Sequence, residues 1–165
     1  MKYFAYGSNM CTGRLKARVP SCTVLTVASL IEHKLCFHKR STDGSGKADA
    51  YFTGNDSDII WGVLFEFDNS EKGELDGHEG LGYGYLEKEV QVLDPEGSSH
   101  LAFLYYADES AIDTSLRPYN WYKRFVIDGA VQHSLPDEYI AMLQKIESVP
   151  DSKPERRDIN LATRC

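Results

Sequence analysis

The chain has 165 residues, of which 42% are hydrophobic and 26% charged, a composition typical of a globular protein. A chain of this length favours one domain with a sizeable core, since two separate cores would each be small. The formal net charge of −7 argues against a nucleic-acid partner, because affinity for phosphate backbones comes from clustered lysine and arginine. We therefore expect one domain over residues 1–150, followed by a polar C-terminal tail over residues 151–165.

The cysteines indicate neither a metal site nor a disulfide framework. Cys11, Cys22, Cys36 and Cys165 lack the short spacings of zinc and redox motifs, so reduced thiols and no bound metal are expected. The first residues run directly into a predicted strand, which differs from the pattern of a secretory leader. No apolar run approaches the ~20 residues that cross a bilayer. These features favour a cytoplasmic protein with no membrane partner.

In chain order, the pattern predicts a first strand over residues 2–6 that breaks at Gly7, and then a helical stretch over residues 9–16. Further strands are predicted where apolar residues alternate or β-branched and aromatic residues gather: 24–31, 34–38, 48–53, 59–67, 85–93 and 101–106. The Gly- and Ser-rich stretch 41–47 is a predicted loop. The segment Asp94-Pro-Glu-Gly97 predicts a turn that joins the last two strands into a hairpin.

Helices are predicted over about 70–78, over 119–132, and after Pro136, where Leu143 and Ile146 share one face with Tyr139. From residue 148 onward, proline, serine and alternating charges predict a loosely held, solvated end. Strands that do not alternate with helices favour an α+β fold, with a small mixed or antiparallel sheet flanked by helices. The pattern leaves open whether this curled sheet closes into a barrel.

The first segment that points to function is Tyr6-Gly7-Ser8-Asn9-Met10. An apolar strand that ends in Gly-Ser-Asn places backbone N–H groups and two short polar side chains at the start of a helix. Such a turn can hold an anion or a polarised carbonyl oxygen.

The second segment is centred on Glu79, which lies between Leu75-Asp76 and the Gly-rich stretch 80–85. A helix is predicted to pass into a strand here, and a partly desolvated carboxylate in a turn lined by aromatic residues is a usable base. The alternative is a solvated glutamate on the surface. Together with the N-terminal turn, Glu79 indicates an enzyme.

Four tyrosines are candidate pocket residues, because each combines an apolar ring with a hydroxyl group that a ligand can use. They are Tyr6, Tyr85, Tyr105 and Tyr122. Packing in the core is the alternative for each of them.

In order along the chain, these segments resemble the γ-glutamylcyclotransferase family. The similarity rests on five segments between residue 3 and about residue 150: Tyr6–Met10, Trp61–Phe65, Leu75-Asp-x-x-Glu79-Gly80, Tyr122–Ala130 and Ser134–Tyr139. The two late helices resemble the branch of the family that acts on γ-glutamyl amino acids and dipeptides.

The resemblance implies that the protein releases 5-oxoproline from a small γ-glutamyl compound. The α-amine of the substrate attacks its own γ-carbonyl and expels the amine on the other side, with Glu79 as general acid and base. The family pattern implies that the glutamyl moiety binds to the turn from Tyr6 to Met10 and to Tyr85, Tyr105 and Tyr122, with Tyr106 as the alternative to Tyr105. It implies no metal and no organic cofactor, and it is compatible with a homodimer.

Two alternatives keep the same fold. The first is a γ-glutamylamine cyclotransferase that acts on a modified or biosynthetic amine, which the helices after residue 119 disfavour. The second is a non-catalytic module that binds a γ-glutamyl ligand, which the carboxylate at Glu79 disfavours because binding alone does not require it.

Overall fold

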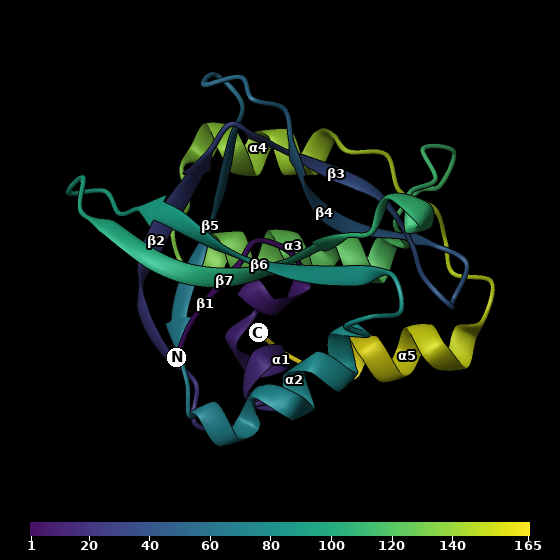
Figure 1. Ribbon diagram of the computed structural model, residues 1–165. Helices are drawn as coiled ribbons and strands as arrows, with labels where there is room; N and C mark the ends of the chain where they lie inside the picture. Colours follow the sequence, from purple (N-terminus) through teal and green to yellow (C-terminus); the bar gives the residue numbers. More distant parts are fainter.

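A closed five-stranded barrel dominates the computed structural model, which describes residues 1–165 (Figure 1). The strands are β1 (Lys2–Ala5), β2 (Thr23–Ile31), β3 (His33–Arg40), β4 (Gly46–Phe52), β5 (Ile59–Glu66), β6 (Tyr85–Leu93) and β7 (Ser99–Ala107). The helices are α1 (Thr12–Lys16), α2 (Lys72–Glu79), α3 (Asn120–Gln132), α4 (Asp137–Lys145) and α5 (Pro154–Ala162), with 3-10 turns η1 (Ser8–Met10), η2 (Asn69–Glu71) and η3 (Glu109–Ala111). The predicted α+β class is therefore confirmed, and the curled sheet is a barrel.

The barrel has the strand order β1-β5-β2-β6-β7, and it closes where Tyr3 of β1 pairs in parallel with Phe103 of β7. The other pairings are antiparallel, including the predicted hairpin of β6 and β7. Strands β3 and β4 form a separate two-stranded sheet. The core includes fully buried side chains on both faces of the barrel wall, with Phe4 and Leu64 on one face and Phe65 on the other.

The predicted helix over residues 9–16 is wrong in one respect, since the structure has two separate pieces, η1 and α1. Cys11 between them has an extended backbone (φ −66°, ψ 105°), which interrupts the helical path. Helix α3 packs directly on η1: a Cβ at Gly129 would lie 2.6 Å from the backbone nitrogen of Cys11 and 2.7 Å from the Cβ of Met10. Because glycine has no Cβ, Gly129 lets α3 approach η1 this closely.

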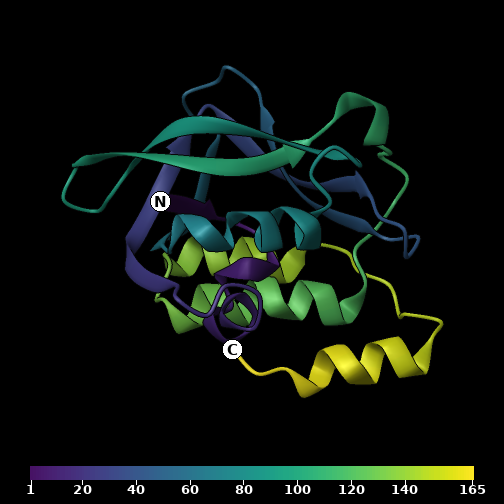
Figure 2. The ribbon, with the colours of Figure 1, turned by 60° about the horizontal axis from the view of Figure 1, so that its bottom comes forward.

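Helices α3 and α4 pack against each other, and α3 and α1 both contact η1, while α1 and α2 lie on the side of the molecule opposite to α4 in Figure 1 (Figures 1 and 2). In Figure 2 helix α5 lies along the outer edge of this layer, and the chain ends beside α1. None of the helices combines the length and the apolar character that a membrane crossing requires.

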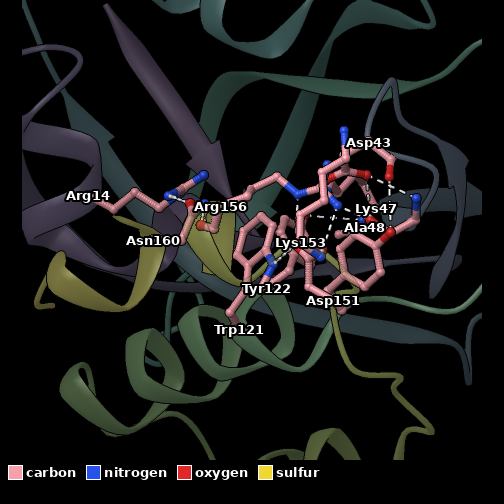
Figure 3. A network of polar contacts seen from close by, with 12 residues as sticks. Arg14, Asp43, Lys47, Ala48, Trp121, Tyr122, Asp151, Lys153, Arg156 and Asn160 are labelled. Atoms are coloured by element: carbon pink, nitrogen blue, oxygen red, sulfur yellow. Dashed lines mark hydrogen bonds and ion pairs between the residues drawn. The ribbon is translucent and has the colours of Figure 1, made fainter. Parts of the chain in front are cut away.

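The prediction of a loosely held tail is wrong, because residues 151–162 are folded around Asp151. This carboxylate accepts hydrogen bonds from the Trp121 indole at 2.9 Å and from Arg156 at 2.7 and 2.6 Å, and also from the backbone N–H of Lys153 (Figure 3). The Arg156 guanidinium stacks over Tyr119 at 5.1 Å from the ring centre. Polar residues in a tail can therefore be partners of the domain rather than of water.

The prediction of four reduced thiols is also wrong, because Cys11 and Cys165 form a disulfide, while Cys22 and Cys36 are free. The pair is 154 residues apart, so no spacing motif could identify it. A Cβ at Gly13 would lie 2.1 Å from the carbonyl oxygen of Arg164, so glycine allows the chain end to lie on α1. In the chain-entropy model a closed loop of this length stabilises the fold by about 5 kcal/mol.

We predict that Asp151→Asn lowers the melting temperature by several degrees at pH 7, because the buried indole and the guanidinium lose a charged acceptor. The hydrogen bonds from Arg156 and Trp121 hold the pKa of Asp151 well below its ordinary value, despite the opposing effect of desolvation. The stabilisation is therefore full above the unfolded pKa of about 4 and is lost as the pH falls further.

Thermal melts of both proteins from neutral to acid pH measure this, and the difference between them should shrink below about pH 4. Asp158→Asn is the matched control, since this exposed carboxylate pairs only with the exposed Arg157 and is expected to contribute little. Equal melting temperatures of Asp151→Asn and wild type at pH 7 would contradict the role of Asp151.

Candidate active site

One cavity, with about 290 Å³ of empty space that is open to solvent, collects nearly all of the predicted site residues. It lies where η1, the end of α2, strands β4, β6 and β7, and helix α3 meet. It is lined by Tyr3, Tyr6, Gly7, Ser8, Asn9, Ala48, Glu79, Tyr85, Tyr105 and Tyr122. Met10 is the exception among the predicted residues, because its side chain is fully buried against α3 and does not line the cavity.

Glu79 is the last residue of α2, which ends because Gly80 adopts the left-handed conformation (φ 73°, ψ 46°). The Glu79 carboxylate receives two hydrogen bonds on the same oxygen. Oε1 accepts from Asn9 Nδ2 at 3.0 Å and from the Arg18 guanidinium, with which it also forms an ion pair. Oε2 has no hydrogen-bond partner within the protein, so one oxygen is fixed and the other is available to a ligand.

The Asn9 side chain holds this arrangement together and is itself 3% exposed. Its Nδ2 donates to the Tyr3 hydroxyl at 3.1 Å as well as to Glu79, and its Oδ1 accepts from Arg18 at 2.9 Å. Both hydrogens of Nδ2 and one lone pair of Oδ1 are thus in use. Asn9, Arg18 and Glu79 form a closed triangle of contacts.

Two tyrosines clamp the backbone of Ala48 on opposite sides. The Tyr85 hydroxyl donates to the carbonyl oxygen of Ala48 at 2.5 Å, and the Tyr122 hydroxyl accepts from its N–H at 3.2 Å. Burial raises the pKa of both phenols, so both remain neutral at physiological pH.

Tyr6 and Tyr105 are also held through their hydroxyl groups, in a chain that ends at Asp76. The Tyr6 hydroxyl donates to the carbonyl oxygen of Tyr105 at 2.5 Å, and the Tyr105 hydroxyl donates to Asp76 at 2.5 Å. Burial, reinforced by the hydrogen bond to Asp76, raises the pKa of Tyr105. Tyr105, rather than Tyr106, therefore faces the cavity, and Asp76 orients it.

The N-terminal turn approaches this frame closely. Met10 N–H donates to the carbonyl oxygen of Gly7 at 3.1 Å and Cys11 N–H to that of Ser8 at 3.3 Å, which closes the 3-10 turn. The N–H groups at the start of such a turn have no acceptor within it. A Cβ on Gly7 would lie 3.1 Å from the Cβ of Ala48 and 3.3 Å from the Tyr122 hydroxyl, so glycine permits this close approach.

Tyr122 also packs against a cluster of cationic and aromatic side chains (Figure 3). The Lys47 ammonium lies 4.6 Å from the ring centres of both Trp121 and Tyr122 and donates to Asp43 at 2.7 Å. Burial lowers the pKa of Lys47, while Asp43 opposes the shift. Since Asp151 holds Trp121, the C-terminal segment also braces this wall of the cavity.

Three residues at the site were not among the sequence candidates: Tyr3, Arg18 and Ala48. Tyr3 lies on the strand just before the predicted turn, so the alternation of β1 was a usable signal for it. Nothing in the local pattern distinguishes Arg18 from Arg14, because only the fold brings α2 next to α1.

The comparisons with known proteins identify the family of the chain. The chain is 35% identical over 150 residues to the γ-glutamylcyclotransferase of Homo sapiens, covering 88% of this chain and 78% of that protein. It belongs to the γ-glutamylcyclotransferase family. The mouse γ-glutamylcyclotransferase is 34% identical over the same coverage, and the AIG2-like family model matches residues 59–158.

Solved structures give the same family. A structure titled γ-glutamyl cyclotransferase superposes with a TM-score of 0.87 at 30% identity, covering 98% of both chains. A structure from Homo sapiens, titled as an uncharacterised protein, superposes with a TM-score of 0.84 at 31% identity, covering 97% of both chains. The family resemblance predicted from the sequence is confirmed, and the roles of the individual site residues stay predictions.

We predict that Gly7→Ala lowers the free energy of unfolding by about 1–3 kcal/mol, the usual cost of overpacking. The added methyl group must displace Ala48 or the Tyr122 hydroxyl. Denaturant unfolding measures the change. Gly77→Ala is the control, because its Cβ would meet nothing within 4 Å and alanine is the better helix former. A stability loss as large in the control would contradict the close approach at Gly7.

Proposed function

We propose that this protein is a γ-glutamylcyclotransferase, which converts a γ-glutamyl compound into 5-oxoproline and a free amine. The observation that carries the proposal is the state of Glu79 in the cavity. One carboxylate oxygen is fixed by Asn9 and Arg18, and the other has no protein partner. A general base needs this combination of fixed orientation and a free lone pair.

In the proposed reaction, Oε2 of Glu79 accepts a proton from the α-ammonium group of the substrate. The freed amine attacks the γ-carbonyl carbon, which forms the C–N bond of the five-membered lactam. The tetrahedral intermediate then expels the second nitrogen, to which Glu79 returns this proton. The attacking nitrogen loses its second proton to Glu79 as the lactam forms, and this proton passes to the released amine, which leaves as an ammonium ion. Atoms balance without water, so the products are 5-oxoproline and the released amine.

The enzyme contributes mainly by holding the substrate folded, since both reacting groups belong to one molecule. Well-oriented intramolecular reactions reach effective molarities of about 10⁵–10⁸ M. The cavity is narrow, and its walls of Tyr6, Tyr85 and Tyr122 are fixed through their hydroxyl groups, which favours one compact substrate conformation. Backbone N–H groups at the start of η1 are the proposed donors to the developing oxyanion.

Arg18 and Asn9 act in this account as positioning residues. Both hold Oε1, which leaves the proton-transfer geometry to Oε2. The pocket tyrosines are neutral because burial raises the pKa of their phenols, so they supply hydrogen bonds rather than a competing base.

We predict that Glu79→Gln lowers kcat for 5-oxoproline release by about 10²–10⁴-fold, because the amide can neither accept nor return the proton. Mass spectrometry of 5-oxoproline formed from γ-glutamyl-alanine, γ-glutamyl-ε-lysine and glutathione measures the rate. Glu74→Gln is the matched control, since Glu74 is an exposed carboxylate on the same helix and should keep the wild-type rate.

Near-normal turnover by Glu79→Gln would contradict the assignment of the base. Wild-type protein that binds γ-glutamyl compounds but releases no 5-oxoproline would favour the binding module instead. Release from γ-glutamyl-ε-lysine alone would favour a γ-glutamylamine cyclotransferase.

A further inference from the structure

Lys39 is a largely buried residue whose ammonium has no role in the reaction described above. The residue is 7% exposed, and its ammonium forms no ion pair with any carboxylate. Two other partly buried lysines are paired with carboxylates, Lys47 with Asp43 and Lys72 with Asp76. The ammonium of Lys88 has a partner as well, His33 Nε2 at 2.9 Å. The stem of Lys39 is buried, while its ammonium keeps contact with solvent and is free to bind an anion.

The ammonium of Lys39 lies beside the cavity. It is 4.3 Å from the centre of the Tyr85 ring, and Tyr85 lines the cavity. A Cβ on Gly84 would lie 3.0 Å from Cε of Lys39, so the stem of the lysine packs against the turn that follows Glu79. Burial lowers the pKa of Lys39, and Glu79 is the carboxylate that opposes this shift most strongly. Its contacts with Tyr85 and with the turn after Glu79 place Lys39 on the Glu79 side of the cavity.

The proposed reaction places the leaving nitrogen within hydrogen-bond reach of Glu79, because Glu79 returns the proton to it. In a γ-glutamyl amino acid, that nitrogen is separated from a free carboxylate by a single carbon. A substrate held in this way brings its carboxylate to the same side of the cavity as Lys39.

We propose that Lys39 is a specificity-determining residue that binds the carboxylate of the leaving amino acid. The inference rests on the proposed function and deepens it, since it selects γ-glutamyl amino acids over γ-glutamyl derivatives of simple amines. The ammonium over Tyr85 supplies the positive charge that an anionic leaving group needs in a protein of net charge −7.

The other cations near the cavity are engaged by the protein. Arg18 is paired with Glu79. Arg14 stacks over Phe125 at 4.6 Å from the ring centre and donates to Asn160 of α5 at 3.3 Å. Lys39 is the one whose ammonium lies over a lining tyrosine and has neither a carboxylate nor an amide as a partner.

The test compares γ-glutamyl-alanine with γ-glutamyl-alaninamide, which differ only in the charge of the leaving group. We expect wild-type protein to prefer the acid. Lys39→Met should lower kcat/KM for the acid by about 10–100-fold, mainly through KM, and bring the ratio between the two substrates close to one. Lys39→Arg, which keeps the charge, should restore part of the preference.

Lys34→Met is the matched control, because Lys34 is an exposed lysine on the same strand, and it should keep the wild-type ratio. Calorimetric Kd values for both compounds, measured on Glu79→Gln with and without Lys39→Met, report recognition separately from turnover. Binding that depends on Lys39, together with no release of 5-oxoproline by the wild-type protein, would therefore contradict the proposed function and support Lys39.

Three results would overturn the role of Lys39. The first is equal loss for the acid and the amide, which would place Lys39 on the glutamyl half. The second is a wild-type protein that does not distinguish the two compounds in kcat/KM and Kd. The third is the absence of binding of either compound.

Discussion

The site depends on the hydrogen bonds of the Asn9 carboxamide, because they join three elements that are distant in sequence. The amide donates to Tyr3 on β1 and to Glu79 at the end of α2, and it accepts from Arg18 just beyond α1. Each contact fixes one direction of the amide. The position of the Glu79 carboxylate therefore follows from the packing of the N-terminal turn, and α3 sets that packing through its close approach at Gly129.

The rest of the molecule keeps this frame narrow and rigid. The hydroxyl groups of Tyr6, Tyr85 and Tyr105 donate hydrogen bonds to backbone carbonyl oxygens or to Asp76. These bonds fix the walls of the cavity before a ligand binds. The C-terminal segment contributes from outside, since Asp151 holds Trp121 and the disulfide ties Cys165 to the residue that follows η1. A preorganised cavity of this kind suits a reaction in which the substrate folds on itself.

Local pattern predicted those parts of the structure that local chemistry determines. The strands, the hairpin, the Gly-Ser-Asn turn and the glutamate before a left-handed glycine were all visible in short segments. Barrel closure was not, because it depends on pairing between β1 and β7 at opposite ends of the domain. Arg18, Lys39 and the Cys11–Cys165 pair were missed for the same reason, since their partners are distant in sequence and only the fold brings them together.

In the proposed function, the cavity promotes attack by the amine of the substrate and not by water. The most direct measurement is the product balance after incubation of the wild-type protein with γ-glutamyl-alanine, with 5-oxoproline, alanine and glutamate quantified together. The account predicts equal amounts of 5-oxoproline and alanine and no glutamate. Equal amounts of glutamate and alanine would indicate hydrolysis by water and would contradict it, as would the absence of any product.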